Sequence, residues 1–193
     1  MRIVAGTYRG RRIHAPSGTV TRPTSDRVRE ALFSRIEATA GPFDGEWSAL
    51  DLFAGSGALG IEALSRGAGH VTFVERDRSA LRVLRSNLES LHLTGRSTVL
   101  SGDSFRLVSH AGLSGAPFSL LFLDPPYRID ESEVRKAIDR LVSLETLLLD
   151  ALVVWEHSSS AHALWPEGFD DLGSRRYGDT AVTLGRAGRG KSC

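Results

Sequence analysis

The stretch Leu50-Asp-Leu-Phe-Ala-Gly-Ser-Gly-Ala-Leu-Gly60 decides the fold that this sequence predicts. It leaves a short apolar run and enters a segment with helical spacing of apolar residues, so it indicates a strand, a tight loop and a helix in that order. Gly55 and Gly57 allow the backbone to turn sharply and to approach a ligand closely, because glycine has no Cβ. Residues 55–60 also match the G-x-G-x-x-G pattern of dinucleotide-binding folds, which is a weak signal when it stands alone.

Asp51 lies just before these glycines, near the end of the predicted strand. A carboxylate at this place would repel a pyrophosphate, but it would attract a cationic or amine-bearing ligand. S-adenosylmethionine carries both a sulfonium and an ammonium group. The loop therefore favours S-adenosylmethionine over a dinucleotide as the ligand.

Short apolar runs alternate with helical periods on both sides of this loop. The predicted strands cover residues 49–53, 70–75, 97–101, 119–123 and 151–156, and the predicted helices cover residues 58–66, 79–91, 104–110 and 131–144. Strands joined by crossover helices form a parallel sheet with both faces covered. Residues 171–177 and 180–185 flank the turn Gly178-Asp179 and predict a hairpin, so the sheet should end with an antiparallel strand.

The chain ahead of residue 41 has a different character. Residues 2–14 predict a short β-hairpin, residues 15–24 a proline- and glycine-containing linker, and residues 26–38 a helix capped by Ser25 or Asp26. We expect Arg27 and Arg29 to lie outside the apolar stripe of that helix.

Two further acids follow predicted strands. Glu75, in Phe73-Val-Glu-Arg-Asp77, could accept hydrogen bonds from ribose hydroxyls, or it could be a solvated acid near the next helix, which Asp77 would cap better. Asp103, in Ser101-Gly-Asp-Ser-Phe105, could bind an adenine amino group or cap the helix that follows, and the sequence favours neither.

The most specific motif is Leu121-Phe-Leu-Asp-Pro-Pro-Tyr127, directly after a strand. Two prolines stiffen the chain and remove two backbone donors, so the Pro125 carbonyl can point outward as an acceptor beside the Asp124 carboxylate. Tyr127 adds a flat stacking surface. Two acceptors and a ring predict a pocket for a planar base with an exocyclic amine. Hydrogen bonds from both amine N–H groups would favour a pyramidal nitrogen whose lone pair can attack a methyl sulfonium held in line.

Composition and charge restrict the function classes. The chain has 193 residues, of which 41% are hydrophobic, and no run long enough to cross a membrane or to act as a secretory signal. Its one cysteine is Cys193, so intrachain disulfides are excluded, and the histidines show no ligand spacing, so we expect no metal. Both ends are rich in arginine and the middle is acidic. This asymmetry fits a polyanionic partner contacted by the ends and fits solvated termini equally well.

Together these motifs resemble a class I S-adenosylmethionine-dependent methyltransferase with a D-P-P-Y motif. The segments Arg2-Ile-Val-Ala-Gly-Thr-Tyr-Arg-Gly-Arg-Arg-Ile13 and Arg22-Pro-Thr-Ser-Asp-Arg-Val-Arg-Glu-Ala-Leu-Phe33 are similar to the RsmD family, which methylates guanine N2 in 16S ribosomal RNA. The C-terminal stretch from Arg176 to Leu184 fits the same family. Members often carry phenylalanine where this chain has Tyr127, and stacking survives that difference.

The resemblance implies an α/β, Rossmann-like fold: a mostly parallel seven-stranded sheet with an antiparallel last strand and a small N-terminal hairpin and helix. We expect an RNA-facing extension over residues 1–40, a methyltransferase domain over 41–187 and a disordered tail over 188–193. The implied partner is 16S rRNA, within an assembling small subunit in the cytoplasm, with no membrane. The expected base-contacting residues are Asp124, Pro125, Pro126 and Tyr127. The expected cofactor-contacting residues are Asp51, Phe53, Gly55, Gly57, Glu75, Asp103 and Ser104. The expected RNA contacts are Arg2, Arg9, Arg11, Arg12, Arg27 and Arg29.

Three alternatives stay open at this point. D-P-P-Y also serves adenine N6 and cytosine N4 methylation, and only the N-terminal segment favours ribosomal RNA. An NAD-dependent oxidoreductase would fit the glycine pattern alone. A non-catalytic RNA-binding module would fit the basic ends alone. His157, which follows a predicted strand, is interpreted as structural or solvated.

Overall fold

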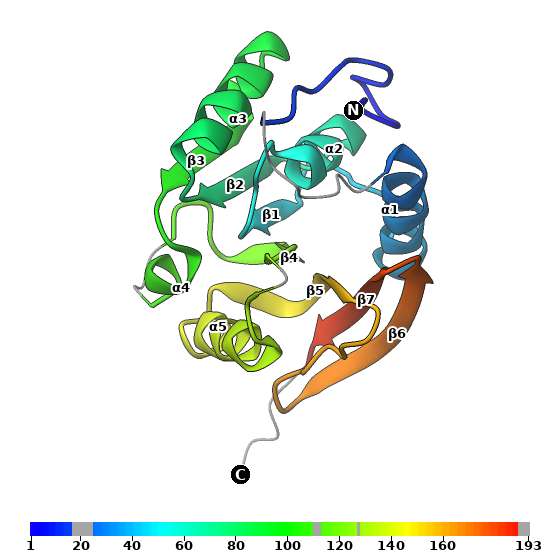
Figure 1. The fold of residues 1–193 in the computed structure, drawn as a ribbon, viewed down its shortest axis with the longest axis vertical. Helices are drawn as coiled ribbons and strands as arrows, with labels where there is room; N and C mark the ends of the chain where they lie inside the picture. The colour runs from blue at the N-terminus through cyan, green and yellow to red at the C-terminus, as the bar shows by residue number, and fades with distance from the viewer. Residues whose placement is uncertain (17–24, 110–112, 127, 189–193) are drawn as a thin grey trace.

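The computed structural model describes residues 1–16, 25–109, 113–126 and 128–188 (Figure 1). Most of the predicted linker, the aromatic residue Tyr127 and the tail after residue 188 lie outside the described residues.

The centre of the molecule is a seven-stranded sheet in the order β3-β2-β1-β4-β5-β7-β6. Its strands are β1 (Ser48–Asp51), β2 (His70–Glu75), β3 (Ser97–Ser101), β4 (Phe118–Leu123), β5 (Leu147–Ser158), β6 (Phe169–Tyr177) and β7 (Thr180–Ala187). Strands β1 to β5 pair in parallel, whereas β7 runs antiparallel to both β5 and β6. The predicted Rossmann-like fold with an antiparallel last strand is confirmed. That last strand lies inside the sheet, between β5 and β6.

Helices cover both faces of the sheet (Figure 1). They are α1 (Asp26–Ala40), α2 (Ala58–Arg66), α3 (Arg78–Ser90), α4 (Ser104–Leu107) and α5 (Glu131–Ser143), with a 3₁₀ turn at Thr94–Arg96. Helices α1, α2 and α3 share one hydrophobic core with the sheet, and α4 and α5 share the other.

Successive side chains along each strand point alternately into one core and into the other. Ala49 faces the α1–α3 side, whereas its neighbour Leu50 faces the α4–α5 side, and Phe122 and Leu121 divide in the same way on β4. Each of these four side chains is completely buried. Burial on both faces explains why the central strands read as continuous apolar runs rather than as alternating ones.

Some element lengths differ from the sequence prediction. Helix α4 is a single turn, and the long strand β5 begins four residues before the predicted start. The predicted N-terminal hairpin is present as an antiparallel bridge between Arg2 and Arg12, with backbone hydrogen bonds between Ile3 and Arg11 and between Met1 and Ile13. The turn side of the segment also bonds to α2, because polar groups of that helix face it.

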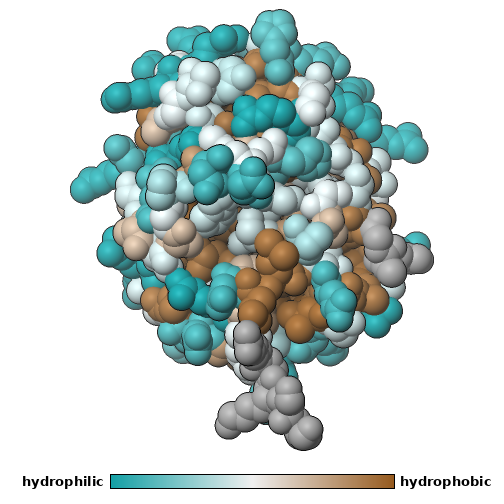
Figure 2. Space-filling model, turned by 180° about the vertical axis from the view of Figure 1, so that it is seen from behind, coloured by the Kyte–Doolittle hydropathy of each residue, from teal (hydrophilic) through white to brown (hydrophobic). Residues whose placement is uncertain are grey.

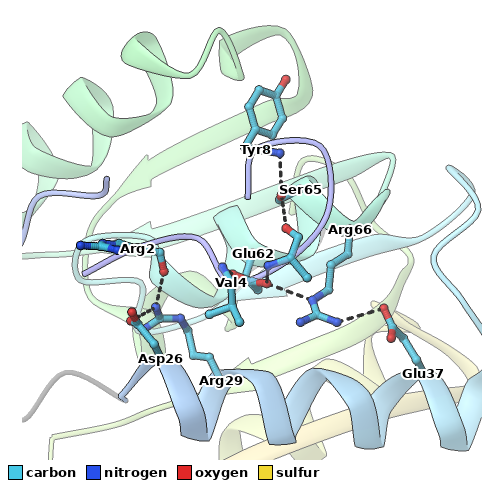
Figure 3. A network of polar contacts seen from close by, with 10 residues as sticks. Arg2, Val4, Tyr8, Asp26, Arg29, Glu37, Glu62, Ser65 and Arg66 are labelled. Atoms are coloured by element: carbon cyan, nitrogen blue, oxygen red, sulfur yellow. Dashed lines mark hydrogen bonds and ion pairs between the residues drawn. The ribbon is translucent and has the colours of Figure 1, made fainter. Parts of the chain in front are cut away.

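The N-terminal segment is anchored on the buried carboxylate of Glu62 in α2 (Figure 3). Glu62 accepts hydrogen bonds from the backbone N–H of Val4 at 2.8 Å and of Ala5 at 3.0 Å. The Arg66 Nε donates to the same carboxylate at 3.0 Å, which balances its charge in the interior. The first residues of the chain are therefore held on the helix that follows the glycine loop.

The prediction that Arg29 lies on the solvent side of α1 is wrong. Arg29 is completely buried, since the spacing of residues 29, 32 and 36 places it on the apolar stripe. Its Nη2 donates to the Arg2 carbonyl at 2.5 Å and to the Asp26 carboxylate at 2.7 Å (Figure 3). Arg29 therefore ties the start of α1 to the start of the chain and does not present its charge at the surface.

Figure 2 shows hydrophobic residues gathered in the lower half of the face seen from behind, with polar residues above them. Among the residues that the structure describes, the exposed large hydrophobic side chains are Val142, Leu148, Leu149 and Leu164. Within the described residues, no helix is both long and apolar enough to span a membrane.

Candidate active site at the carboxyl edge of the sheet

Acidic side chains gather where the parallel strands β1, β2, β4 and β5 end. Asp51 and Glu75 close β1 and β2, Asp124 directly follows β4, and Glu156 lies near the end of β5. Parallel strands place their carboxyl ends at one edge of a sheet, and ligands of such folds bind at this edge. The sequence therefore brings four acids from distant positions into one site.

The glycine loop opens this site on the β1 side. Gly57 caps α2 in the left-handed region at φ 83°, and a Cβ on it would lie 2.4 Å from the Leu84 Cδ1. Gly55 also has a positive φ of 54°, yet a Cβ on it would meet nothing within 4 Å. Gly57 is thus required by packing, whereas Gly55 leaves open space beside the backbone. That open space is where a ligand could approach the loop.

Glu75 fastens the loop to the end of β2. One carboxylate oxygen accepts from the Gly55 N–H at 2.8 Å, and the other accepts from the backbone N–H of Arg76 at 2.8 Å and of Asp77 at 2.7 Å. Asp77, as expected, caps α3 through the N–H groups of its first turn. The Glu75 oxygen that accepts from Gly55 still carries lone-pair capacity for a further donor such as a hydroxyl.

Asp51 is an acid buried beneath the loop, with 2% of its surface exposed. It accepts a hydrogen bond from the Gly60 N–H at 3.2 Å. Burial raises the pKa of Asp51 to about 7, hydrogen bonds from Gly60 and Phe53 oppose that rise, and the nearby Glu75 adds to it. Asp51 is therefore poised to take up negative charge when a cationic group binds beside it.

Asp103 caps α4, and its carboxylate also forms an ion pair. It accepts from the Arg106 N–H at 3.2 Å and lies 3.3 Å from an Arg76 guanidinium nitrogen. Ser104 hydrogen-bonds the Leu52 carbonyl, so α4 is fixed to the loop after β1. The Phe53 ring packs against the Phe105 ring with centroids 5.8 Å apart. These contacts place Phe53, Asp103 and Ser104 beside the glycine loop.

Asp124 is the acid that begins the proline motif. Asp124 is an exposed residue, and crowding of its carboxyl group by protein atoms, with Glu156 and then Asp51 as neighbouring charges, raises its pKa above the ordinary value. The Pro126 carbonyl accepts from the Ile129 N–H at 2.9 Å, whereas no described residue donates to the Pro125 carbonyl. Asp124 and the Pro125 carbonyl are thus two acceptors on one rigid turn.

A small cavity lies beside this turn, between β4, β5 and α5. Its lining includes Pro125, Pro126, Trp155 and Glu156. The sequence reasoning did not select Glu156, although the rule that found the other strand-end acids applies to it.

His157 belongs to β5, and its ring nitrogens bond the Thr183 hydroxyl and the Ser158 carbonyl, both at 2.8 Å. These contacts agree with the interpretation of His157 as a structural residue.

The chemistry of these donors and acceptors suits S-adenosylmethionine. The strand-end carboxylates match the hydroxyl, ammonium and sulfonium groups of that molecule, and the open space at Gly55 leaves room for a ligand against the backbone. Within the described part of the chain, no three His, Cys, Asp or Glu residues form a group that could hold a metal ion.

Of the arginines predicted to contact RNA, all but one lie at the surface. Arg2, Arg9, Arg12 and Arg27 are exposed, as is Arg11, which also donates to the Ser90 carbonyl at 2.8 Å. Arg29 is buried and lies outside this surface set.

Comparison with known proteins gives one family match and several close relatives. The model of the family described as "Conserved hypothetical protein 95" matches residues 1–186. A Bacillus subtilis protein, "Putative rRNA methyltransferase YlbH", is 40% identical over 95% of this chain and 97% of its own. "Ribosomal RNA small subunit methyltransferase D" of Haemophilus influenzae is 34% identical over 95% of this chain and 92% of its own.

A solved structure has the same arrangement of elements. "Putative methyltransferase yhhF" from Escherichia coli superimposes with a TM-score of 0.82 at 33% identity, covering 97% of this chain and 98% of its own. The agreement extends over nearly the whole chain, so it includes the N-terminal segment as well as the sheet.

Proposed function

Because this chain belongs to the RsmD family, whose model spans residues 1–186, we propose that it transfers a methyl group from S-adenosylmethionine to the exocyclic N2 of a guanine in 16S rRNA. At the coarser level, the chain is an rRNA methyltransferase, as are the relatives by name. The literal dinucleotide pattern of the glycine loop therefore does not indicate an NAD-dependent oxidoreductase here.

The observation that carries the proposal is the meeting of Asp51 and Asp124 at one edge of the sheet, close enough for the charge of Asp51 to influence Asp124. One acid belongs to the glycine loop and the other to the proline turn. A methyl donor at the first and an amine at the second would be neighbours, and this proximity is the main requirement of a direct transfer.

The glycine-loop side is the proposed methyl-donor site. S-adenosylmethionine, when bound, supplies an electrophilic methyl group on a positively charged sulfur. Asp51 would balance positive charge, Glu75 would accept hydrogen bonds from ribose hydroxyls, and Asp103 would accept from the adenine amine. Gly55 and Gly57, with Phe53 and Ser104, shape the walls of this site.

The proline turn is the proposed amine site. Asp124 and the Pro125 carbonyl would each accept one N–H of the base amine, and Pro126 keeps the turn rigid. As the new N–C bond forms, the S–C bond of the donor would break and its electron pair would stay on the sulfur of the departing S-adenosylhomocysteine. The methylated nitrogen then carries one proton too many. Asp124 is the acceptor placed to take it, and its raised pKa makes it a stronger base than an ordinary carboxylate. Stacking by Tyr127, outside the described residues, stays a prediction.

The exposed arginines of the N-terminal segment supply the proposed contact with RNA. Arg2, Arg9, Arg11 and Arg12 would meet phosphates and position the substrate without reading sequence, and Arg27 lies at the start of α1. We place this activity in the cytoplasm, on an assembling small subunit.

Mass spectrometry of rRNA nucleosides tests the proposal. Cells that lack this gene should lose N2-methylguanosine at one small-subunit position, and the wild-type gene should restore it, whereas the Asp124→Ala variant should not. An unchanged N2-methylguanosine profile would refute the proposal, and loss of N6-methyladenosine or N4-methylcytidine instead would assign the chemistry to adenine or cytosine.

A further inference from the structure

We infer that Glu156 selects guanine as the substrate base by accepting its N1–H while Asp124 accepts its N2 amine. This inference rests on the proposed function and names the residue that would decide which base is accepted. It begins with the position of Glu156, which the glycine loop and the proline motif do not explain.

Glu156 is the counterpart of Asp124 on the neighbouring strand. Leu123 of β4 pairs with Trp155 of β5, so Asp124 and Glu156 are the next residues on two adjacent parallel strands. Successive residues of a strand point to opposite faces, and both residues therefore leave the sheet on the same face. Glu156 is 8% exposed, and alternation places its side chain on the face opposite to Trp155 and α5.

Two neighbouring carboxylates repel each other, and each is stabilised by hydrogen-bond donors. The ring nitrogens of His157 bond Thr183 and Ser158 rather than either acid. A ligand that brings two adjacent N–H groups would donate to both acids at once. Such a ligand would also relieve their repulsion.

The nucleobases differ in this respect. The Watson–Crick edge of guanine presents two adjacent donors, N1–H and the N2 amine. The adenine edge presents the N6 amine beside the N1 acceptor, and the cytosine edge presents the N4 amine beside the N3 acceptor. A second carboxylate would face a lone pair in both of those bases, which is unfavourable. A pair of acids at this place therefore discriminates in favour of guanine.

The analogue 2-aminopurine tests the proposed contact. It keeps the N2 amine of guanine but has an unprotonated N1 and no O6 carbonyl, so it offers Asp124 the same group and offers Glu156 a lone pair. The missing O6 is the same for wild type and variant, so the difference between their preferences reports on Glu156. The target nucleotide would first be mapped with wild-type enzyme on small subunits from cells lacking the gene. An RNA with guanine or 2-aminopurine at that position would then be compared as substrate.

We expect wild-type enzyme to prefer guanine by about 100-fold or more in kcat/KM, because a site built for a donor rejects an analogue without it. In Glu156→Gln the side-chain amide can donate to the unprotonated N1, so the preference should fall below about tenfold. Binding of S-adenosylhomocysteine should not change in this variant. Glu167→Gln, an exposed acid after β5, is the matched control and should retain the wild-type preference.

The outcomes separate two failures. If wild-type enzyme transfers no methyl group to the RNA, the proposed function fails before Glu156 is tested. If wild-type enzyme methylates guanine and 2-aminopurine equally well, the role of Glu156 is refuted, and this result needs no variant. An unchanged preference in a folded Glu156→Gln variant would refute it as well.

Discussion

A negative charge on Asp51 destabilises the fold because the residue is buried, but the same charge would favour binding of a cationic ligand. Because its pKa is raised to about 7, the folded protein keeps a proton that the unfolded chain has already lost between about pH 4 and pH 7. The contribution of Asp51 to stability therefore falls as pH rises through that window. Above pH 7 the buried charge costs the fold up to about 4 kcal/mol, an upper bound from the size of the shift.

Replacing Asp51 with asparagine should remove this dependence. We expect the Asp51→Asn variant to gain about 2–4 kcal/mol relative to wild type when the pH is raised from 4.5 to 8, measured by urea unfolding at both pH values. The exposed Asp170→Asn substitution should show no such gain. A stability difference between Asp51→Asn and wild type that is the same at both pH values would show that Asp51 does not titrate in this range.

At the scale of elements, the two glycines of the loop after β1 should respond differently to alanine. Gly57→Ala should lower stability by about 2–4 kcal/mol, since it combines a left-handed backbone with a clash against Leu84. Gly55→Ala should lower it by only about 1 kcal/mol, from the backbone alone, but should weaken S-adenosylhomocysteine binding at least tenfold.

Thermal unfolding and ligand titration of these two variants check this prediction. Equal ligand affinity in Gly55→Ala and wild type would mean that the open space beside Gly55 is not the ligand site.

The sequence predicted the strands and helices well where burial is continuous. The ranges of β2 and α2 agree with the structure, because their apolar runs are bounded by polar or glycine residues. The attachment of the N-terminal hairpin to α2 was not predicted. Two of its backbone N–H groups bond Glu62, an acid inside an apolar helix, and such a long-range partner leaves no local pattern.

The site was predictable from sequence in so far as acids end parallel strands. Asp51, Glu75 and Asp124 follow from that rule, and Glu156 follows from it too although it was not selected. Arg29 was misplaced because a charged residue on an apolar stripe is ordinarily expected at its edge. Its burial depends on the Arg2 carbonyl and on Asp26, and the first of these partners is distant in sequence.

For the whole molecule, the exposed arginines of the N-terminal segment should govern affinity for RNA. Replacing Arg9, Arg11 and Arg12 with alanine should weaken binding of a 16S rRNA fragment, most strongly at low salt. The slope of log affinity against log salt should fall by about one for each phosphate that the variant no longer neutralises. Filter binding at several salt concentrations measures this. S-adenosylhomocysteine affinity should stay unchanged, and an unaltered salt slope would exclude this segment from the RNA interface.

The central claim is that Asp124 holds the reacting amine while the glycine loop holds the methyl donor. The most direct test is the Asp124→Ala variant, measured for methyl transfer to undermethylated small subunits and for binding of S-adenosylhomocysteine and of RNA. We predict a loss of at least 100-fold in kcat, with both affinities within about threefold of wild type. Methyl transfer at the wild-type rate in this variant would contradict the account.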